Sequence, residues 1–172
     1  KWGGRRRFIN LQTNGQDKET MKRYRAAGVD CHHSNMEVWD KRLFEWINPG
    51  KNRRVGWDGW VKSLIDEVDV FGEGNVRPNF VGGVEMAKPY GFETVAAAVK
   101  STSDGVDFMM RHGIIPRFNQ WRREPGSNLV SQHDQPAIPL EYYLQLMGNY
   151  YNSWKKYNLP MPRRECVHPE RR

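Results

Sequence analysis

The chain has 172 residues, 38% of them hydrophobic and 27% charged, which is enough apolar material for one folded domain and excludes wholesale disorder. No run of about 18 apolar residues occurs, so no membrane-spanning segment is predicted. Lysine and arginine number 27 against 20 acidic residues, giving a formal net charge of +7. This charge suits an anionic partner such as nucleic acid or a phosphorylated cofactor, but scattered basic residues are also typical of a solvated surface.

The cysteines indicate a reducing compartment. Cys31 and Cys166 are far apart and belong to no paired pattern, so the sequence predicts neither a disulfide framework nor a CxxC zinc site. No secretory signal is visible at the N-terminus, and we expect a cytoplasmic protein. The sequence opens with Lys1 rather than Met, which favours a processed product or a segment of something longer.

The first half of the chain alternates between short strands and helices. A buried strand is predicted over residues 7–11, followed by a turn at 13–15 and a helix over 17–27 that Asp17 caps and Gly28 ends. A second strand covers 29–32, and the next helix covers 38–47. At Asn48, Pro49 and Gly50 this helix stops, and a turn or loop is predicted there.

The second half continues the alternation. The clearest helix covers 56–71, where apolar residues recur at i, i+3, i+4, i+7 and i+8, and a strand over 76–81 and a helix over 92–111 follow. A fourth strand covers 114–118, and the stretch 122–136 is polar. Pro139 opens a last helix with apolar side chains on one face: Leu140, Tyr143, Leu144, Met147, Tyr151 and Trp154.

This order of elements predicts an α/β fold with a parallel sheet, because helices separate successive strands. Four strands are few for such a fold, since a complete (β/α) barrel takes about 250 residues. We therefore expect a partial (β/α) barrel with parallel strands, incomplete without a preceding segment, or a small open α/β sheet. The chain 1–172 is treated as one domain, with 137–172 a terminal helix and tail.

Polar residues follow every predicted strand, at the edge where parallel α/β proteins bind ligands. His32 and His33 do not favour a metal site, because neighbouring residues of a strand point to opposite faces. Glu37 suits either a general base or the N-terminal end of the following helix. The complete set is Gln12, Thr13 and Asn14; His32, His33, Asn35 and Glu37; Asn79, Gly82 and Glu85; and Asn119, Gln120 and Trp121.

Four segments resemble a known family in their order and spacing. They are LQTNG (11–15), HHSNMEVWDKRLFEWINPGK (32–51), VRPNFVGGVE (76–85) and HGIIPRFNQWRREPGSNL (112–129). Together they resemble the radical S-adenosylmethionine (SAM) enzymes, in the biotin synthase-like branch. The resemblance implies the C-terminal portion of a TIM-type barrel that binds SAM and faces the substrate. In that family SAM is cleaved to a 5'-deoxyadenosyl radical, which abstracts hydrogen from the substrate.

The resemblance also implies roles for individual residues at the methionyl end of SAM. Asn35 and Glu37 match residues that hydrogen-bond the ribose and the amino group, and a carboxylate is a suitable acceptor for both. Arg54 matches an arginine that pairs with the methionyl carboxylate, with Arg53 or Lys51 as substitutes if the register differs.

Further positions are implied around the rest of the cofactor and the substrate. Val81 and Gly82 match backbone that passes along the adenine, where a glycine allows close approach. Thr13 and Asn14 match positions near SAM or its cluster, although a plain Asn-Gly turn explains them too. The residues implied to face the substrate are Asn79, Asn119 and Trp121.

One departure from the family is large. Its four-iron four-sulfur (4Fe-4S) cluster is bound through CxxxCxxC, which is absent here, so this chain has no predicted metal ligands and its catalytic residues stay unassigned. A cluster is expected only if a preceding barrel segment or complementary subunit supplies the cysteines, with a reductant protein as a further partner. The alternative is a non-catalytic basic α/β protein that binds nucleic acid or acts as a scaffold subunit. It is less favoured because no RNA-binding module is recognisable.

Overall fold

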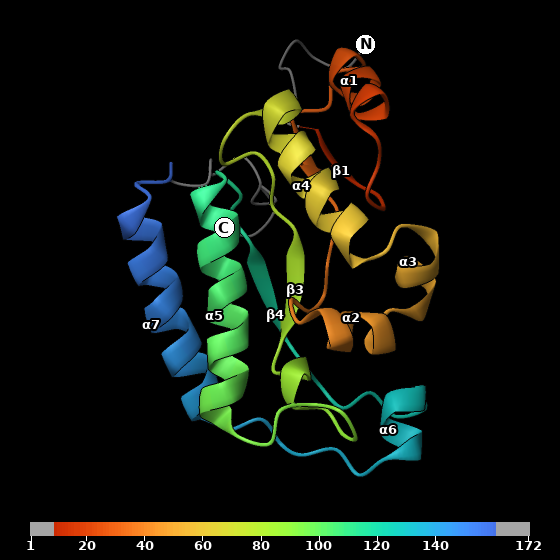
Figure 1. The fold of residues 1–172 in the computed structure, drawn as a ribbon, viewed down its shortest axis with the longest axis vertical. Coiled ribbons are helices and arrows are strands. Elements are labelled where there is room, and N and C mark those ends of the chain that lie inside the picture. Colours follow the sequence, from red (N-terminus) through yellow and green to blue (C-terminus); the bar gives the residue numbers. More distant parts are fainter. Residues whose placement is uncertain (1–8, 161–172) are drawn as a thin grey trace, which may run out of the picture.

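The computed structural model describes residues 9–160 (Figure 1). The start of the first predicted strand, the predicted tail beyond residue 160 and Cys166 lie outside these residues. The chain is mixed α/β, with helices and strands interleaved along its length. In order the elements are β1 (Asn10–Gln12), α1 (Lys18–Ala26), β2 (Cys31–His33), α2 (Lys41–Ile47), α3 (Pro49–Arg54), α4 (Trp57–Phe71), β3 (Asn79–Gly82), the 3-10 turn η1 (Val84–Met86), α5 (Val95–Arg111), β4 (Arg117–Gln120), α6 (Asn128–Gln132) and α7 (Leu140–Lys156).

Every strand pairing within residues 9–160 is parallel. β1 pairs with β2 and β3 pairs with β4, and isolated parallel bridges at His32–Val76 and Glu37–Phe80 connect the two pairs. The strands therefore lie side by side in sequence order. This confirms the predicted parallel arrangement, which follows from the helices that separate the strands.

β2, β3 and β4 start two or three residues later than the apolar runs predict. Ile114 and Ile115 are buried, yet the β4 ladder starts only at Arg117. Val76 is likewise buried but makes only an isolated bridge before β3 begins at Asn79. The difference arises because an apolar run reports burial, whereas a ladder requires a neighbouring strand in register.

The cap predicted at Asp17 is confirmed, whereas α2 and α5 begin three residues later than predicted, after the capping residues Asp40 and Thr94. The side chain of Asp17 accepts a hydrogen bond from the Thr20 N–H, and Asp40 and Thr94 cap α2 and α5 in the same way. The turn or loop predicted after residue 48 is wrong, because α3 begins there with Pro49. Proline at the first helical position has a suitable φ and lacks only an N–H that would be unsatisfied anyway.

α7 packs along α5 (Figure 1), but not through the apolar face that the sequence predicts. Tyr142 and Leu146 are fully buried against Ala98 and Val99 of α5. On the predicted face, Tyr143 and Trp154 are half-buried, whereas the others are exposed: Leu140, Leu144, Met147 and Tyr151. Both faces carry large apolar residues, so periodicity alone could not decide which one packs. No helix in the described part of the chain is long and apolar enough to cross a membrane.

The main core lies between the strands and the helices α1, α2 and α4. Its largest fully buried side chains include Trp60, Phe44, Phe80 and Met36. α1 packs against α4 beside the β1–β2 pair (Figure 1), which places the end of both strands next to the start of α4. This packing positions the loops that form the candidate site.

Candidate functional site

A cavity of about 550 Å³ lies at the carboxyl ends of β1 and β2. The two strands are parallel neighbours, so the loops that leave them meet at one edge of the sheet. Four residues predicted to bind a cofactor come together here: Thr13, Asn14, Asn35 and Glu37. The remaining lining residues are Gln12, Gln16, Lys51 and Trp60.

Glu37 has an unusual backbone conformation. Its φ is +70°, in the left-handed region that residues other than Gly, Asn and Asp rarely adopt. The Glu37 N–H donates to the Asn79 carbonyl at 3.1 Å, and the Glu37 carbonyl accepts from the Val81 N–H at 2.8 Å. β3 therefore holds the backbone of Glu37 on both sides. A strained residue that is fixed in this way is typical of ligand sites.

Lys51 is the cation that faces Glu37. Its Nζ lies 2.6 Å from Glu37 Oε1 and 2.8 Å from the Asn35 carbonyl oxygen, and it sits over the Trp60 ring. Both charged side chains are 25% exposed, so they remain accessible to a ligand. A carboxylate and an ammonium in one pocket can bind the two ends of a zwitterion.

Asn35 joins the pocket to β3. Its Oδ1 accepts a hydrogen bond from the Asn79 N–H at 3.0 Å. Asn79 is itself buried, and its side chain donates to the Phe80 carbonyl. Asn79 therefore supports a pocket residue instead of lining the cavity.

The other predicted site residues are not brought to this cavity. Arg54 is exposed at the end of α3, one turn after Lys51. Val81 and Gly82 lie within β3, where Gly82 is buried and its carbonyl accepts from the Trp121 N–H. Asn119 is exposed on β4, and Trp121 is half-buried directly after it.

Sequence reasoning missed Gln16 and Trp60 as lining residues. Trp60 belongs to the apolar pattern of α4 and is fully buried, but its Nε1 donates to the Ser34 carbonyl at 3.1 Å. An apolar period gives no indication that such a residue also forms a pocket wall. Gln16 directly follows the turn predicted at 13–15, but nothing in the sequence indicates that this turn lies beside Ser63 of α4.

His32 and His33 point in different directions, as neighbouring strand residues do. His33 Nδ1 donates to the Arg77 carbonyl, while the His32 ring stacks on Phe71 of α4. Burial and the positive charge of Arg117 lower the pKa of His33 to about 4. Within residues 9–160 no three His, Cys, Asp or Glu side chains are grouped so that they could hold a metal ion.

A second polar cluster is buried away from the pocket. Glu85 is fully buried and accepts hydrogen bonds from Thr102 Oγ1 at 2.7 Å, from Tyr142 OH at 2.9 Å and from the Gly83 N–H at 2.8 Å. Burial raises the pKa of Glu85 despite these donors. The hydrogen bonds of this cluster connect η1, α5 and α7.

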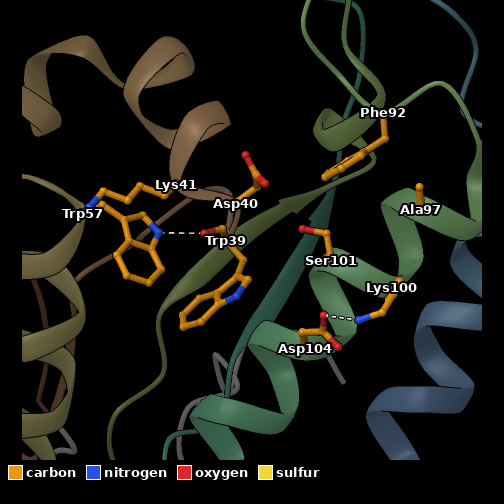
Figure 2. Close-up of a pocket in the computed structure, with 9 residues that line it drawn as sticks. All are labelled: Trp39, Asp40, Lys41, Trp57, Phe92, Ala97, Lys100, Ser101 and Asp104. Carbon is orange, nitrogen blue, oxygen red and sulfur yellow. Dashed lines mark hydrogen bonds and ion pairs between the residues drawn. The ribbon is translucent and has the colours of Figure 1, made fainter.

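A second cavity of about 440 Å³ lies between α4 and α5 (Figure 2). The side chains of Trp39 and Trp57 both line this cavity. The Trp39 carbonyl accepts a hydrogen bond from Nε1 of Trp57. The two lysines in the lining already pair with acidic side chains, Lys41 with Asp58 and Lys100 with Asp104. This cavity lies among the helices rather than at the strand ends, and it offers aromatic faces more than polar contacts.

Comparisons with protein-family models, with curated proteins and with solved structures found no match to this chain. The functional assignment therefore depends on the pocket and on the residues that line it.

Proposed function

We propose that this chain is the SAM-binding and substrate-facing portion of a radical SAM enzyme and that its sheet is part of a (β/α) barrel. The observation that carries the proposal is Glu37, held in a left-handed conformation by β3 and paired with Lys51 at 2.6 Å in the pocket lining. Glu37 binds the ammonium or ribose hydroxyls of SAM, and Lys51 binds the carboxylate. Lys51 takes the role first expected of Arg54 because its ammonium lies in the pocket.

The residues of this chain fit SAM but not an iron-sulfur cluster. Carboxylate, ammonium and amide groups surround the cavity, and the Lys51 ammonium lies over the buried Trp60 ring. SAM supplies the radical chemistry of the family. The sequence has two cysteines, fewer than the three thiolates of CxxxCxxC, and Cys31 is buried beside His33 instead of lining the pocket. We therefore assign to this chain the binding of SAM and the positioning of substrate, and no step that involves the cluster.

A further barrel segment, on the same polypeptide or on a partner chain, is the second part of the proposal. Among the described residues, β4 pairs only with β3, and the side of α7 away from α5 exposes Leu140, Leu144 and Met147. If the barrel closes, the first β/α unit of a preceding segment would pair with the edge of β4 and cover the apolar stripe of α7. The test is the DNA around this coding sequence. CxxxCxxC encoded upstream of Lys1 or in an adjacent gene supports the proposal, and its absence from both contradicts it.

The binding proposal is tested by calorimetry with SAM. We expect saturable binding that Lys51→Ala and Glu37→Gln each weaken by at least about tenfold, since a charge-assisted contact contributes roughly 1.5–3 kcal/mol. Lys41→Ala is the matched control, because Lys41 also pairs with a carboxylate at 2.6 Å but lies outside this pocket. No binding of SAM, or equal losses in all three variants, would refute the assignment. Salt-sensitive binding of nucleic acid in its place would favour the non-catalytic alternative.

A further inference from the structure

The cavity between α4 and α5 has walls made of aromatic rings (Figure 2). The rings of Trp39 and Trp57 meet edge to face with 5.1 Å between their centroids, and Phe92 also lines the cavity. Trp39 lies directly on the backbone of α5, because a Cβ at Gly105 would come within 2.4 Å of its ring, and Phe108 packs on it at 5.2 Å. The fold therefore fixes the aromatic wall in advance, and the volume of about 440 Å³ is that of a small-molecule site.

The fold leaves three polar groups of this cavity unused. Asp40 caps α2 through Oδ1, which accepts from the Leu43 N–H at 2.9 Å, and its Oδ2 has no hydrogen-bond partner among residues 9–160. The Ser101 hydroxyl and the Trp39 Nε1–H are also without a partner in the described part of the chain, whereas Trp57 Nε1 donates to the Trp39 carbonyl. Figure 2 shows Asp40 and Ser101 on either side of one gap. An acceptor, a donor and a hydroxyl that can do either are therefore available to a ligand.

The lysines that line the cavity are already neutralised. Lys41 Nζ lies 2.6 Å from Asp58 Oδ2, and Lys100 Nζ lies 2.7 Å from Asp104 Oδ2. An anionic ligand would have to break one of these ion pairs and expose its carboxylate to the same anion. The cavity is therefore unsuited to a phosphate or carboxylate group.

A cation and a plain hydrocarbon suit the cavity no better. The Trp57 ring already carries Lys41 Nζ at 5.8 Å from its centroid, and the Phe92 ring carries Arg42 Cζ at 5.9 Å, so an added cation would meet two positive charges. A hydrocarbon would cover the three unused polar groups without replacing the hydrogen bonds that water makes to them. What remains is an uncharged ring with hydrogen-bonding groups on its edge.

We propose that this cavity binds an uncharged heteroaromatic ring that carries an amino group, as the base of a purine nucleoside does. The ring stacks on the aromatic wall, as bases do on aromatic side chains in general. Its amino group donates to Asp40 Oδ2, and a ring nitrogen accepts from the Ser101 hydroxyl or the Trp39 Nε1–H. This cavity shares no lining residue with the pocket at the ends of β1 and β2, so the inference is independent of the proposed function.

Adenosine is the probe, and NMR of the tryptophan indole N–H groups reports where it binds. We expect a saturable shift of the Trp39 signal and none of the Trp60 signal, because Trp60 lines the other pocket. Purine riboside, which has the same ring without the amino group, should bind at least about tenfold more weakly, since the Asp40 carboxylate then has no donor. The absence of a saturable Trp39 shift, a shift of Trp60 in its place, or equal binding of both nucleosides would overturn the proposal. Failure of SAM to bind would contradict only the proposed function.

Two substitutions in the first turn of α5 test the location of the nucleoside. Ala97→Leu fills the cavity, whereas Ala96→Leu adds the same side chain at an exposed position outside it. We expect only Ala97→Leu to abolish the binding of adenosine, while the Trp60 signal of both variants stays as in the parent and shows that the fold is intact. Adenosine binding by Ala97→Leu as tight as by the parent would overturn the proposal.

A milder pair of variants tests the hydroxyl contact without filling the cavity. Ser101→Ala should weaken adenosine binding by about threefold to tenfold, the range for a single uncharged hydrogen bond. Ser103→Ala is the matched control, because the Ser103 hydroxyl accepts from Asn149 on α7 and lies outside the cavity, and it should bind adenosine as the parent does. Equal losses in the two variants would contradict the assignment. Tighter, salt-sensitive binding of single-stranded oligoadenylate would also contradict it, since the base would then belong to a nucleic acid and not to a free nucleoside.

Discussion

The strained backbone of Glu37 predicts that two similar substitutions have different effects on stability. A left-handed conformation costs roughly 1–2 kcal/mol for an ordinary L-residue, and asparagine tolerates it better than glutamine does. Glu37→Gln and Glu37→Asn both lose the ion pair with Lys51, which contributes about 0–1 kcal/mol because both side chains are partly exposed. Only Glu37→Asn also relieves strain, so we expect it to be more stable than Glu37→Gln by about 1 kcal/mol.

Urea denaturation followed by tryptophan fluorescence measures this difference as a change in midpoint at constant m-value. Glu45 is the control position, because it is exposed within α2. There the order should reverse, since glutamine has the higher helix propensity. Both Glu37 variants should bind SAM at least about tenfold more weakly than the parent, so stability and binding change independently. If Glu37→Asn were no more stable than Glu37→Gln, the left-handed strain would not be a property of the protein.

Three further predictions concern other sites. Burial raises the pKa of Glu85 above the usual value of 4.5. The protonated Glu85 therefore stabilises the folded state fully below pH 4.5, and this stabilisation is lost as the pH rises through the folded-state pKa. We expect the urea midpoint of Glu85→Gln to change less between about pH 4.5 and 8 than that of the parent protein. Gly105→Ala should cost about 1–3 kcal/mol in a thermal melt, because the new Cβ would lie 2.4 Å from the Trp39 ring, whereas Gly148→Ala meets no atom within 4 Å and should not destabilise the protein. Arg54→Ala should leave the calorimetric Kd for SAM within about twofold, and a tenfold loss would instead make Arg54 the carboxylate ligand.

Much of the fold could be predicted because its determinants are local. The cap at Asp17 and the apolar period of α4 depend on residues within a few positions of each other. The parallel order of strands follows from the helices that separate them. The strand limits and α3 were mispredicted because pairing depends on a neighbouring strand and because Asn48, Pro49 and Gly50 suit both a break and a helix start.

The sequence by itself determined that polar groups gather at the ends of β1 and β2, since parallel strands bring their exits to one edge. Only the tertiary structure decided that Lys51 and not Arg54 pairs with Glu37. The two residues lie one turn apart on α3, but the Lys51 side chain lines the pocket and the Arg54 side chain is exposed to solvent. It also decided that Glu67 faces His32 across 35 positions of the chain, a contact that depends on how α4 packs on the strands. Long-range contacts of this kind depend on the path of the whole chain, and no local period or spacing encodes them.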